Sequence, residues 1–501
     1  MNEKDLNKNH FSNSDKQLFL INLKSQLDMG ALLSRYSRTS NLDIRDLFYR
    51  EFSENEKRGR EFYERVFLEY GDESIAELVN VHMGVQNISN LLVKLIEETR
   101  IGASYIEKSS RYVRYDKKVD GKYLYLPFES TGIKEEFHEK YESLMERMFD
   151  YYSRTLPVLE KIIGEAYPLE SITPDLSDHN LKAYQTALRS RALDDIRSIL
   201  PVSTLTNVGI SSNARAIVSI IQKLESANFK EAKIISDLLY SEMYEEYGEI
   251  IKSARNNHGA EHTKYLSSLS NFLRYSNTVN NFDKDTVLLN YNEWAIKNLG
   301  ILFNNEGNGN ISLKEITNYF FERRKNRRDK VPRQFEFVDL TYSLRMNYGA
   351  FREFQRHRMF SILRGQIDPV HGFHIPEYIK ENQILKEEFE QICTESAELY
   401  RDIFNSGSKY EAQYVLPFAT RYNILVKTNL RELVYFAELR STPQAHPDLR
   451  IIAQDMAIEF LKKQPELVGI FKFLDKNSYP LGRFSQEARK EKKISNMEKS
   501  E

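Results

Sequence analysis

The chain of 501 residues has only one cysteine, Cys393, and one tryptophan. A single cysteine excludes a disulfide framework and any metal site built on several thiolates. Residues 1–16 are polar and contain no apolar segment of the kind that forms a signal peptide. No stretch reaches the roughly 18 apolar residues that a membrane-spanning helix needs. We therefore expect a soluble cytoplasmic protein.

Neither sign of charge predominates, because 71 lysines and arginines nearly balance 73 aspartates and glutamates. This balance argues against a general nucleic-acid-binding protein but leaves room for a local basic site. The strongest basic run is ERRKNRRDK at 322–330, which we interpret as a solvated loop or a wall beside a phosphate. A nucleic-acid interface is the alternative, and it would require a larger positive surface around this run.

Two common cofactor signals are also missing. The sequence has no glycine-rich phosphate loop and no dinucleotide fingerprint, so a flavin or nicotinamide would have to bind outside a Rossmann fold. His371 and His374 lie three positions apart, but no set of Asp, Glu or Cys completes a metal site with them. We predict loop histidines and no metal.

The sequence does contain a repeat. In the first half RSILPVSTLT precedes SSNARAIVSIIQKL, and in the second half QYVLPFATRY precedes TNLRELVYFAELR. Each pair predicts a Leu-Pro start, a Ser or Thr cap, and an amphipathic helix opened by Asn-x-Arg. Asn213 and Asn429 lie 216 positions apart, whereas Glu77 and Glu336 lie 259 apart. The two halves therefore share elements but differ in loop lengths.

The repeat predicts the domain organisation, with a boundary near residue 283. We expect an N-terminal extension at 1–30, a first unit at 31–283 with a helical insertion near 115–185, a second unit at 284–485, and a polar, solvated tail at 486–501. Apolar periodicity predicts helices at 82–98, 211–227, 231–254, 384–406 and 428–440. Short strands are predicted at 79–85, 286–291 and 336–344. Helices with a minority of strand indicate an α+β fold.

One cluster of charge suits a ligand. Arg356, His357 and Arg358 are adjacent within an apolar and aromatic segment, YGAFREFQRHRMF. Guanidinium groups bind phosphate through paired hydrogen bonds, and the apolar side offers a surface for a flat ring. Asn429 and Arg440 are about three helical turns apart, so they would project from one helix face. A site for an anionic, partly aromatic ligand is predicted, although solvated helix faces and polar helix ends would give the same patterns.

The first half offers complementary groups. Glu107, Ser109 and Arg111 alternate after an amphipathic helix and could present carboxylate, hydroxyl and guanidinium to a phosphosugar. An ordinary capped helix end is the alternative there. Arg197 stands before a Leu-Pro in an apolar stretch, and a buried arginine needs an acidic or phosphate partner. The aspartates at 194 and 195 could equally provide it.

These motifs, in this order, resemble the flavin-dependent thymidylate synthases. That family is built around an Arg-His-Arg run, a serine seven residues further on, a Leu-Pro segment and an Asn-Ala-Arg helix that ends in Leu-Arg. The chain is similar to two such units in tandem, over roughly residues 31–260 and 284–465. The resemblance implies two helix-rich α+β units, each with a small antiparallel sheet.

Each half departs from the family pattern in a different place. The first half has Thr99-Arg100-Ile101 in place of Arg-His-Arg and Leu224 in place of the helix-ending arginine, but it keeps Glu107, Ser109, Arg111, Tyr112 and Arg197. The second half keeps Arg356, His357, Arg358, Asn429 and Arg440, but it has Gln366 in place of the serine and Gln413 in place of the Leu-Pro arginine. Complementary losses imply a composite site between the halves. A homodimer would then form a pseudo-tetramer with two sites.

The resemblance also implies a reaction, the reductive C5-methylation of dUMP to dTMP. The one-carbon unit would come from methylenetetrahydrofolate, and FAD reduced by NADPH would supply the hydride. The implied catalytic residues are Arg440, His357 and Ser109. The implied substrate-binding residues are Arg356, Glu107, Ser109, Arg111, Arg197 and Arg440. The implied cofactor-binding residues are Arg356, His357, Arg358, Asn429, Arg431, Glu77 and Glu336.

Four further positions differ from the family pattern: Asp72, Val331, Glu353 and Tyr435. Asp72 and Val331 replace a histidine, Glu353 replaces a glutamine near the nucleotide, and Tyr435 replaces an asparagine that contacts flavin. Two alternatives stay open for this reason. One is a catalytically inactive nucleotide-binding or scaffolding relative, and the other is a flavoenzyme for another pyrimidine nucleotide. Nucleic acid and membrane are not expected as partners.

Overall fold

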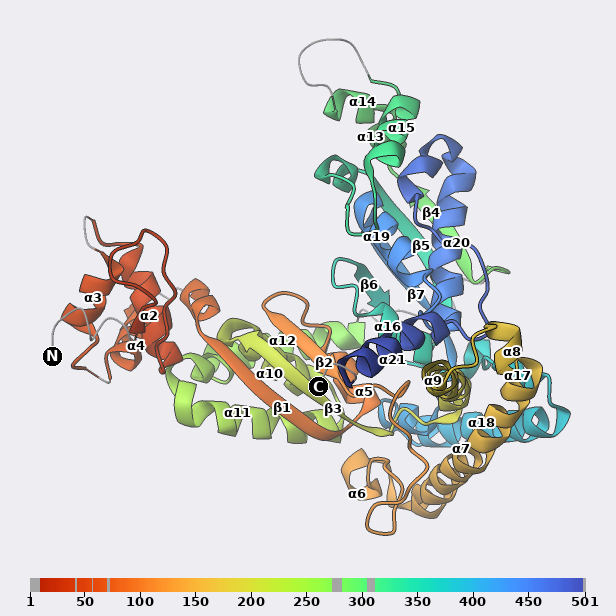
Figure 1. Ribbon diagram of the computed structural model, residues 1–501. Helices are drawn as coiled ribbons and strands as arrows, with labels where there is room; N and C mark the ends of the chain where they lie inside the picture. Colours follow the sequence, from red (N-terminus) through yellow and green to blue (C-terminus); the bar gives the residue numbers. More distant parts are fainter. Residues whose placement is uncertain are drawn as a thin grey trace. The chain divides into compact units, whose positions relative to one another are not determined.

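The computed structural model describes residues 10–40, 43–55, 57–69, 73–272, 282–303 and 311–498 (Figure 1). Asp72 therefore lies outside the described residues. The chain divides into two compact units. The N-terminal unit comprises residues 1–108, 130–132 and 205–273, and the C-terminal unit comprises residues 109–129, 133–204 and 274–501. The compact units thus do not follow the repeat, because residues 109–129 and 133–204 of the first repeat belong to the C-terminal unit.

The N-terminal unit contains a three-stranded antiparallel sheet in the order β1-β3-β2. Its strands are β1 (Asn80–Ser89), β2 (Ala103–Glu107) and β3 (Leu205–Asn213). Its helices are α2 (Gln26–Tyr36), α3 (Ile44–Glu51), α4 (Arg58–Glu69), α5 (Asn90–Ile96), α10 (Ala214–Ser226), α11 (Lys230–Ile251) and α12 (Asn257–Phe272). Apolar residues of β1 and β3 pack with α5 and α10 in one core, and the N-terminal helices form a second core with α10 and α11.

The C-terminal unit contains a four-stranded antiparallel sheet in the order β4-β5-β7-β6. Its strands are β4 (Thr286–Tyr291), β5 (Asp339–Asn347), β6 (Ser361–Arg364) and β7 (Arg421–Asn429). Helices α16 (Tyr348–Phe354), α19 (Leu430–Arg440) and α20 (Pro447–Lys463) pack with this sheet. The remaining longer helices are α7 (His138–Ala166), α9 (Asp178–Ile196), α15 (Leu313–Arg323), α18 (Gln383–Asn405) and α21 (Phe484–Glu498).

Short helices connect these elements. They are η1 (Glu73–Leu78), η4 (Lys252–Ala254), α6 (Phe128–Thr131), η2 (Glu135–Phe137), α8 (Leu169–Ile172), η3 (Arg197–Ile199), α13 (Glu293–Lys297), α14 (Leu299–Leu302), η5 (Arg333–Phe337), η6 (Pro369–His371), α17 (Glu377–Lys380), η7 (Glu411–Val415) and η8 (Pro465–Phe471). The helix-rich α+β fold with two small antiparallel sheets is confirmed. None of the helices in the described residues combines the length and apolarity needed to cross a bilayer.

The repeat is visible in equivalent contacts within each sheet. Asn213 pairs with Asn80 across β1 and β3, and Asn429 pairs with Asp339 across β5 and β7. Each asparagine caps the following helix by accepting a backbone hydrogen bond, from Ala216 in the first half and from Glu432 in the second. The Glu-Arg ion pair is also repeated at 2.7 Å in each half, as Glu77–Arg215 and Glu336–Arg431.

The two Leu-Pro segments meet each other inside the C-terminal unit. Val202 N donates to Leu416 O, and Phe418 N donates to Leu200 O, both at 2.8 Å. These two bonds exchange under the 216-residue repeat, and Pro201 lies opposite Pro417 between them. The Leu-Pro segments therefore form a local pseudo-twofold contact, as a duplicated interface would.

Helices α7 and α18 join the repeats in the same unit. Arg147 and Arg154 of α7 form ion pairs with Glu395 and Glu388 of α18, seven residues apart on each helix in antiparallel sense. Lys140 pairs with Asp402 at 3.5 Å one further heptad along. Tyr151 is buried between them and donates its hydroxyl to Leu385 O at 2.9 Å. Material from both repeats therefore builds the C-terminal unit.

Several predicted elements need correction. Residues 80–89 form a strand, so the helix predicted at 82–98 is limited to α5. The central strands β3 and β7 were not predicted, because their mixed polar and small residues show no clear alternation. The helix caps are Asn213 and Asn429 instead of Ser or Thr. The C-terminal residues form α21, which packs on α9, instead of a solvated tail.

Candidate composite site

Arg111 and Asp194 form a buried ion pair in the C-terminal unit. The guanidinium binds the carboxylate through two bonds, Nε to Oδ1 at 2.6 Å and Nη2 to Oδ2 at 2.7 Å. Burial opposes ionisation of Asp194, but the charge of Arg111 outweighs it and lowers the pKa of Asp194 to about 2. Asp194 therefore stays ionised at neutral pH. Arg111, which was predicted to bind a phosphate, is already paired with this carboxylate.

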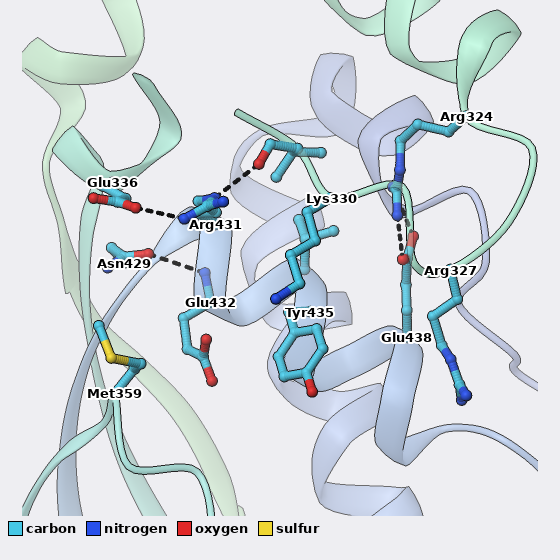
Figure 2. Close-up of a pocket in the computed structure, with 12 residues that line it drawn as sticks. Arg324, Arg327, Lys330, Glu336, Met359, Asn429, Arg431, Glu432, Tyr435 and Glu438 are labelled. Carbon is cyan, nitrogen blue, oxygen red and sulfur yellow. Dashed lines mark hydrogen bonds and ion pairs between the residues drawn. The ribbon is translucent and has the colours of Figure 1, made fainter. Parts of the chain in front are cut away.

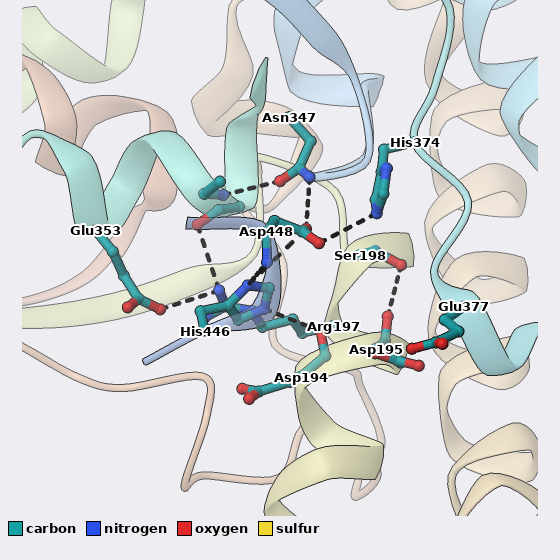
Figure 3. Close-up of polar contacts among 12 residues, drawn as sticks. Asp194, Asp195, Arg197, Ser198, Asn347, Glu353, His374, Glu377, His446 and Asp448 are labelled. Carbon is teal, nitrogen blue, oxygen red and sulfur yellow. Dashed lines mark hydrogen bonds and ion pairs between the residues drawn. The ribbon is translucent and has the colours of Figure 1, made fainter. Parts of the chain in front are cut away.

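Glu353 connects the two repeats at this point (Figure 3). Its carboxylate lies 3.1 Å from Nη2 of Arg197, 3.5 Å from Nη1 of Arg111 and 4.0 Å from Nη1 of Arg440. Burial would raise the pKa of Glu353, but the nearby arginines hold it well below its usual value. The partner of Arg197 is therefore Glu353, not Asp194 or Asp195 as the sequence suggested.

The hydroxyl that faces these arginines belongs to Ser110. Ser110 is 3% exposed and accepts hydrogen bonds from Nη1 of Arg197 at 3.3 Å and from Nη1 of Arg352 at 3.1 Å. Ser109 is partly exposed, and its hydroxyl accepts from the backbone N of Arg111 at 3.3 Å. The sequence contains Ser109 and Ser110 side by side, and no pattern in it distinguished which one turns inward.

Arg440 and His357 make the second wall. Nε of Arg440 donates to Nε2 of His357 at 2.8 Å. Because Nε2 accepts, the ring proton belongs on Nδ1, which lies 3.5 Å from the carboxylate of Glu432. Burial lowers the pKa of His357, and Phe436 packs edge-on against its ring at 4.7 Å. His357 is thus a neutral acceptor that orients Arg440, a role that sequence alone did not suggest.

Three of the predicted cofactor residues, Glu336, Asn429 and Arg431, line a separate cavity of about 180 Å³ (Figure 2). Arg431 donates to Val331 O at 2.8 Å and pairs with Glu336, and Asn429 caps α19. Tyr435 lies beneath the ammonium group of Lys330, 4.9 Å from the ring centroid. The structure therefore brings Asn429, Arg431 and Glu336 together, with the departures Val331 and Tyr435 in the same wall.

Some side chains of this cavity are of a kind that suits part of a flavin dinucleotide. Arg327 and Lys330 supply positive charge suited to a phosphate, and Tyr435 supplies an aromatic face. The volume is below the roughly 300–1,000 Å³ that is usual for small-molecule sites. A whole dinucleotide would extend beyond the cavity.

Arg356 and Arg358 flank His357 and are exposed. The other two predicted site residues belong to the N-terminal unit. Glu107 forms an ion pair with Lys94 at 2.7 Å, and Glu77 forms one with Arg215.

The structure also corrects the alignment of the Arg-His-Arg run with the first repeat. Helices α5 and α16 have the same length and begin after the caps Ser89 and Asn347. Counted from these caps, Arg356-His357-Arg358 corresponds to Glu98-Thr99-Arg100, one position earlier than the predicted Thr99-Arg100-Ile101. The first repeat lacks the histidine in either alignment.

Asp448 anchors a polar network beside the cluster (Figure 3). Its carboxylate accepts from Asn347 Nδ2 at 2.7 Å and lies 3.3 Å from Nε2 of His374. Burial lowers the pKa of His446 to about 4, and burial raises the pKa of Asp195 to about 6. The sequence had given this network no role.

Known proteins resemble the chain at two levels. The family described as thymidylate synthase complementing protein matches residues 24–247 and 304–466. A UPF0159 protein of Thermoplasma acidophilum is 44% identical over 492 residues, 93% of this chain and 98% of its own. A UPF0159 protein of Chlamydia pneumoniae is 31% identical over 527 residues, which cover 96% of this chain and 96% of its own. A flavin-dependent thymidylate synthase of Thermococcus onnurineus is 37% identical over 93 residues, 18% of this chain and 38% of its own.

Proposed function

Because the chain belongs to the thymidylate synthase complementing protein family, we propose that it catalyses the reductive C5-methylation of dUMP to dTMP. Methylenetetrahydrofolate would provide the carbon unit, and NADPH would reduce the flavin. The observation that carries this proposal is the meeting of Arg111 and Arg197 from the first repeat with Glu353, His357 and Arg440 from the second. The residues that we propose for the two sides of the site thus lie in a single compact unit.

Arg440 is the residue that we assign to the chemical step. Its side chain is 21% exposed, so its guanidinium can reach a ligand while Nε stays bonded to His357. A guanidinium beside the uracil O2 and N3 would stabilise the negative charge that develops as C5 becomes nucleophilic. His357 acts as a positioning residue, because its neutral ring fixes the direction of Arg440.

Ser110, Arg111 and Arg197 would position the nucleotide. Their hydroxyl and guanidinium donors converge on one place, and such convergence fixes a phosphosugar relative to Arg440. When bound, a flavin would supply the hydride, and Arg327, Lys330 and Tyr435 would hold part of it. Cys393 is buried in α18, and burial raises the pKa of its thiol well above the usual value. It is therefore unsuited to act as a nucleophile.

A catalytically inactive nucleotide-binding relative is the second candidate. It is favoured by the pairing of Arg111 with Asp194 and of Arg197 with Glu353, since paired arginines attract a phosphate less strongly. We further propose that two chains form a dimer with one composite site per chain.

The test is direct. The purified protein is incubated with FAD, NADPH, methylenetetrahydrofolate and dUMP, and dTMP is measured by chromatography together with the visible flavin spectrum. The expected result is dTMP formation and a flavin spectrum that dUMP changes. Arg440→Met should lose most of the dTMP formation and keep the dUMP-dependent spectral change, and Arg189→Met on the exposed side of α9 should keep both. Binding of dUMP without flavin and without dTMP would overturn the synthase proposal and support the inactive relative.

A further inference from the structure

Two buried arginines of the C-terminal unit differ from Arg111 and Arg197 in having no carboxylate partner among the residues that the structure describes. Arg450 is 5% exposed, and Arg483 is 7% exposed. In the part of the chain that the structure describes, no carboxylate comes within 4.0 Å of either guanidinium. Arg450 donates one long bond, at 3.4 Å, to Pro443 O and lies 5.4 Å from the ring of Tyr479. Its charge is therefore only weakly compensated.

Arg483 is less satisfied still. Its Nε and Nη1 atoms are buried and have no hydrogen-bond partner among the described residues, while its guanidinium lies 4.4 Å from the centroid of the Tyr112 ring. A cation over an aromatic face gains some stabilisation, but the buried N–H groups still lack acceptors. Buried donors without acceptors are rare in folded proteins, and a water molecule or ion that accepts their hydrogen bonds is one explanation for them.

The two arginines face the same space. Both line a small cavity of about 20 Å³, together with Arg111 and Asp194. Arg450 also lines an adjoining cavity of about 350 Å³, whose walls include the cations Arg191 and Lys476 and the carboxylates of Asp194, Asp195, Glu377 and Asp448. The larger cavity is within the usual size range for small-molecule sites, whereas the smaller one holds about one water-sized group. An anion in the larger cavity would meet Arg450, which shares the lining of the smaller cavity with Arg483.

The segment that carries Arg483 is held firmly. A side chain at Gly482 would place its Cβ 1.9 Å from Pro443 O, so only glycine permits this approach. Residues 479–483 also lie beyond residue 466, where the match to the family ends. The subsite is thus built partly by a segment outside the family match.

We propose that Arg450 and Arg483 form an anion subsite that binds a phosphate group. The pairing of Arg111 and Arg197 leaves Arg450 and Arg483 as the buried cations that gain most from such a ligand. The phosphate could belong to the nucleotide, in which case the subsite rests on the proposed function, or it could be free phosphate. In either case the recognised chemistry is the same.

The experiment measures binding of inorganic phosphate and dUMP by calorimetry and by thermal unfolding. The variants are Arg450→Met and Arg483→Met, and Arg189→Met is the matched exposed control. We expect phosphate to stabilise the wild type and Arg189→Met, with at least about tenfold weaker binding in each of the two site variants. Gly482→Ala should weaken binding through displacement of Arg483, and it provides a further variant if Arg450→Met fails to fold.

The outcomes separate the two sources of phosphate. Competition between phosphate and dUMP, with no competition from deoxyuridine, would assign the subsite to the nucleotide. Simultaneous binding of phosphate and dUMP would assign it to a free anion. Equal phosphate affinity in the wild type and both site variants, or no phosphate binding at all, would overturn the inference even if dTMP is formed. Phosphate binding that depends on both arginines, in a protein that forms no dTMP, would uphold it while the proposed function fails.

Discussion

Replacement of Glu353 by glutamine tests whether this carboxylate balances the arginines of the composite site. The substitution keeps the shape of the side chain and removes its charge, which is shared by Arg197 at 3.1 Å, Arg111 at 3.5 Å and Arg440 at 4.0 Å. Breaking a buried ion pair costs about 3–5 kcal/mol. Arg111 keeps Asp194, and the new amide can still accept from Arg197. We therefore expect a loss near the lower end, about 3 kcal/mol.

In a unit of this size the loss corresponds to a fall in melting temperature of about 4–5 °C at pH 7. Circular dichroism would measure it, with Glu165→Gln as the control, since the Lys161 and Glu165 side chains are 76% and 67% exposed and an exposed pair contributes about 0–1 kcal/mol. A phosphate dianion should restore more stability to Glu353→Gln than to the wild type, because it replaces the missing charge beside the arginines.

The pH dependence of the stability difference between the wild type and Glu353→Gln provides the result that would refute this reasoning. The folded state lowers the pKa of Glu353 below the ordinary 4.5, so its contribution is present above pH 4.5 and is lost as the pH falls further. The gap between the wild type and Glu353→Gln should therefore narrow in acid. A variant as stable as the wild type at pH 7, or a gap that does not change with pH, would show that Glu353 does not balance the arginines.

Three other predictions follow from the same contacts. Arg440→Met should lower kcat for dTMP formation about 10²–10³-fold with a smaller change in KM, and an unchanged kcat would remove Arg440 from the chemical step. Lys94→Met should cost about 3–5 kcal/mol in thermal unfolding, and adding Glu107→Gln should recover part of it; no recovery would contradict the buried pair. The folded state lowers the pKa of His446 from 6.5 to about 4, so its contribution to stability is present above pH 6.5 and is lost as the pH falls through 4. The folded state raises the pKa of Asp195 from 3.8 to about 6, so its contribution is present below pH 3.8 and is lost as the pH rises through 6. His446→Asn and Asp195→Asn should therefore shift the pH profile of stability in opposite directions by about 3 kcal/mol each, and profiles that match the wild type would refute both shifts.

The sequence predicted the parts of the fold that depend on local pattern. Helices α10, α11, α18 and α19 and strand β4 lie close to their predicted ranges, because apolar periodicity and Asn-x-Arg openings are local signals. The central strands β3 and β7 were missed, because their polar and small residues do not show the apolar alternation that marks a strand in the sequence. Glu353 was identified only as a departure from the family, and its pairing with Arg197 depends on contacts about 150 residues apart.

The directions in which neighbouring side chains of one loop point also could not be predicted from the sequence. Ser109 and Ser110 are the same residue type in adjacent positions, and only the fold determines that Ser110 meets Arg197 and Arg352. Similarly, nothing local in the sequence indicates that Arg483 is buried over Tyr112 by a segment that Gly482 holds in place. Such contacts arise from tertiary packing.

The divergence of the two repeats has a physical explanation in one equivalent position. Lys94 and Arg352 are each the fifth residue of a seven-residue helix that follows an equivalent cap. Lys94 is fully buried and pairs with Glu97 and Glu107 of its own unit, so its ammonium group is already bound to carboxylates of the first repeat. Arg352 instead donates to Ser110 of the other repeat.

Because the charge of Lys94 is already neutralised, this position of the first repeat offers no positive charge to a second nucleotide. We therefore predict one dUMP bound per chain in calorimetry. Lys94→Met should leave this stoichiometry unchanged, because the Lys94 side chain is enclosed by its carboxylates and presents nothing to a ligand. Two equivalent dUMP molecules per chain would contradict the reasoning, since the first repeat would then retain a working site despite its buried ion pairs.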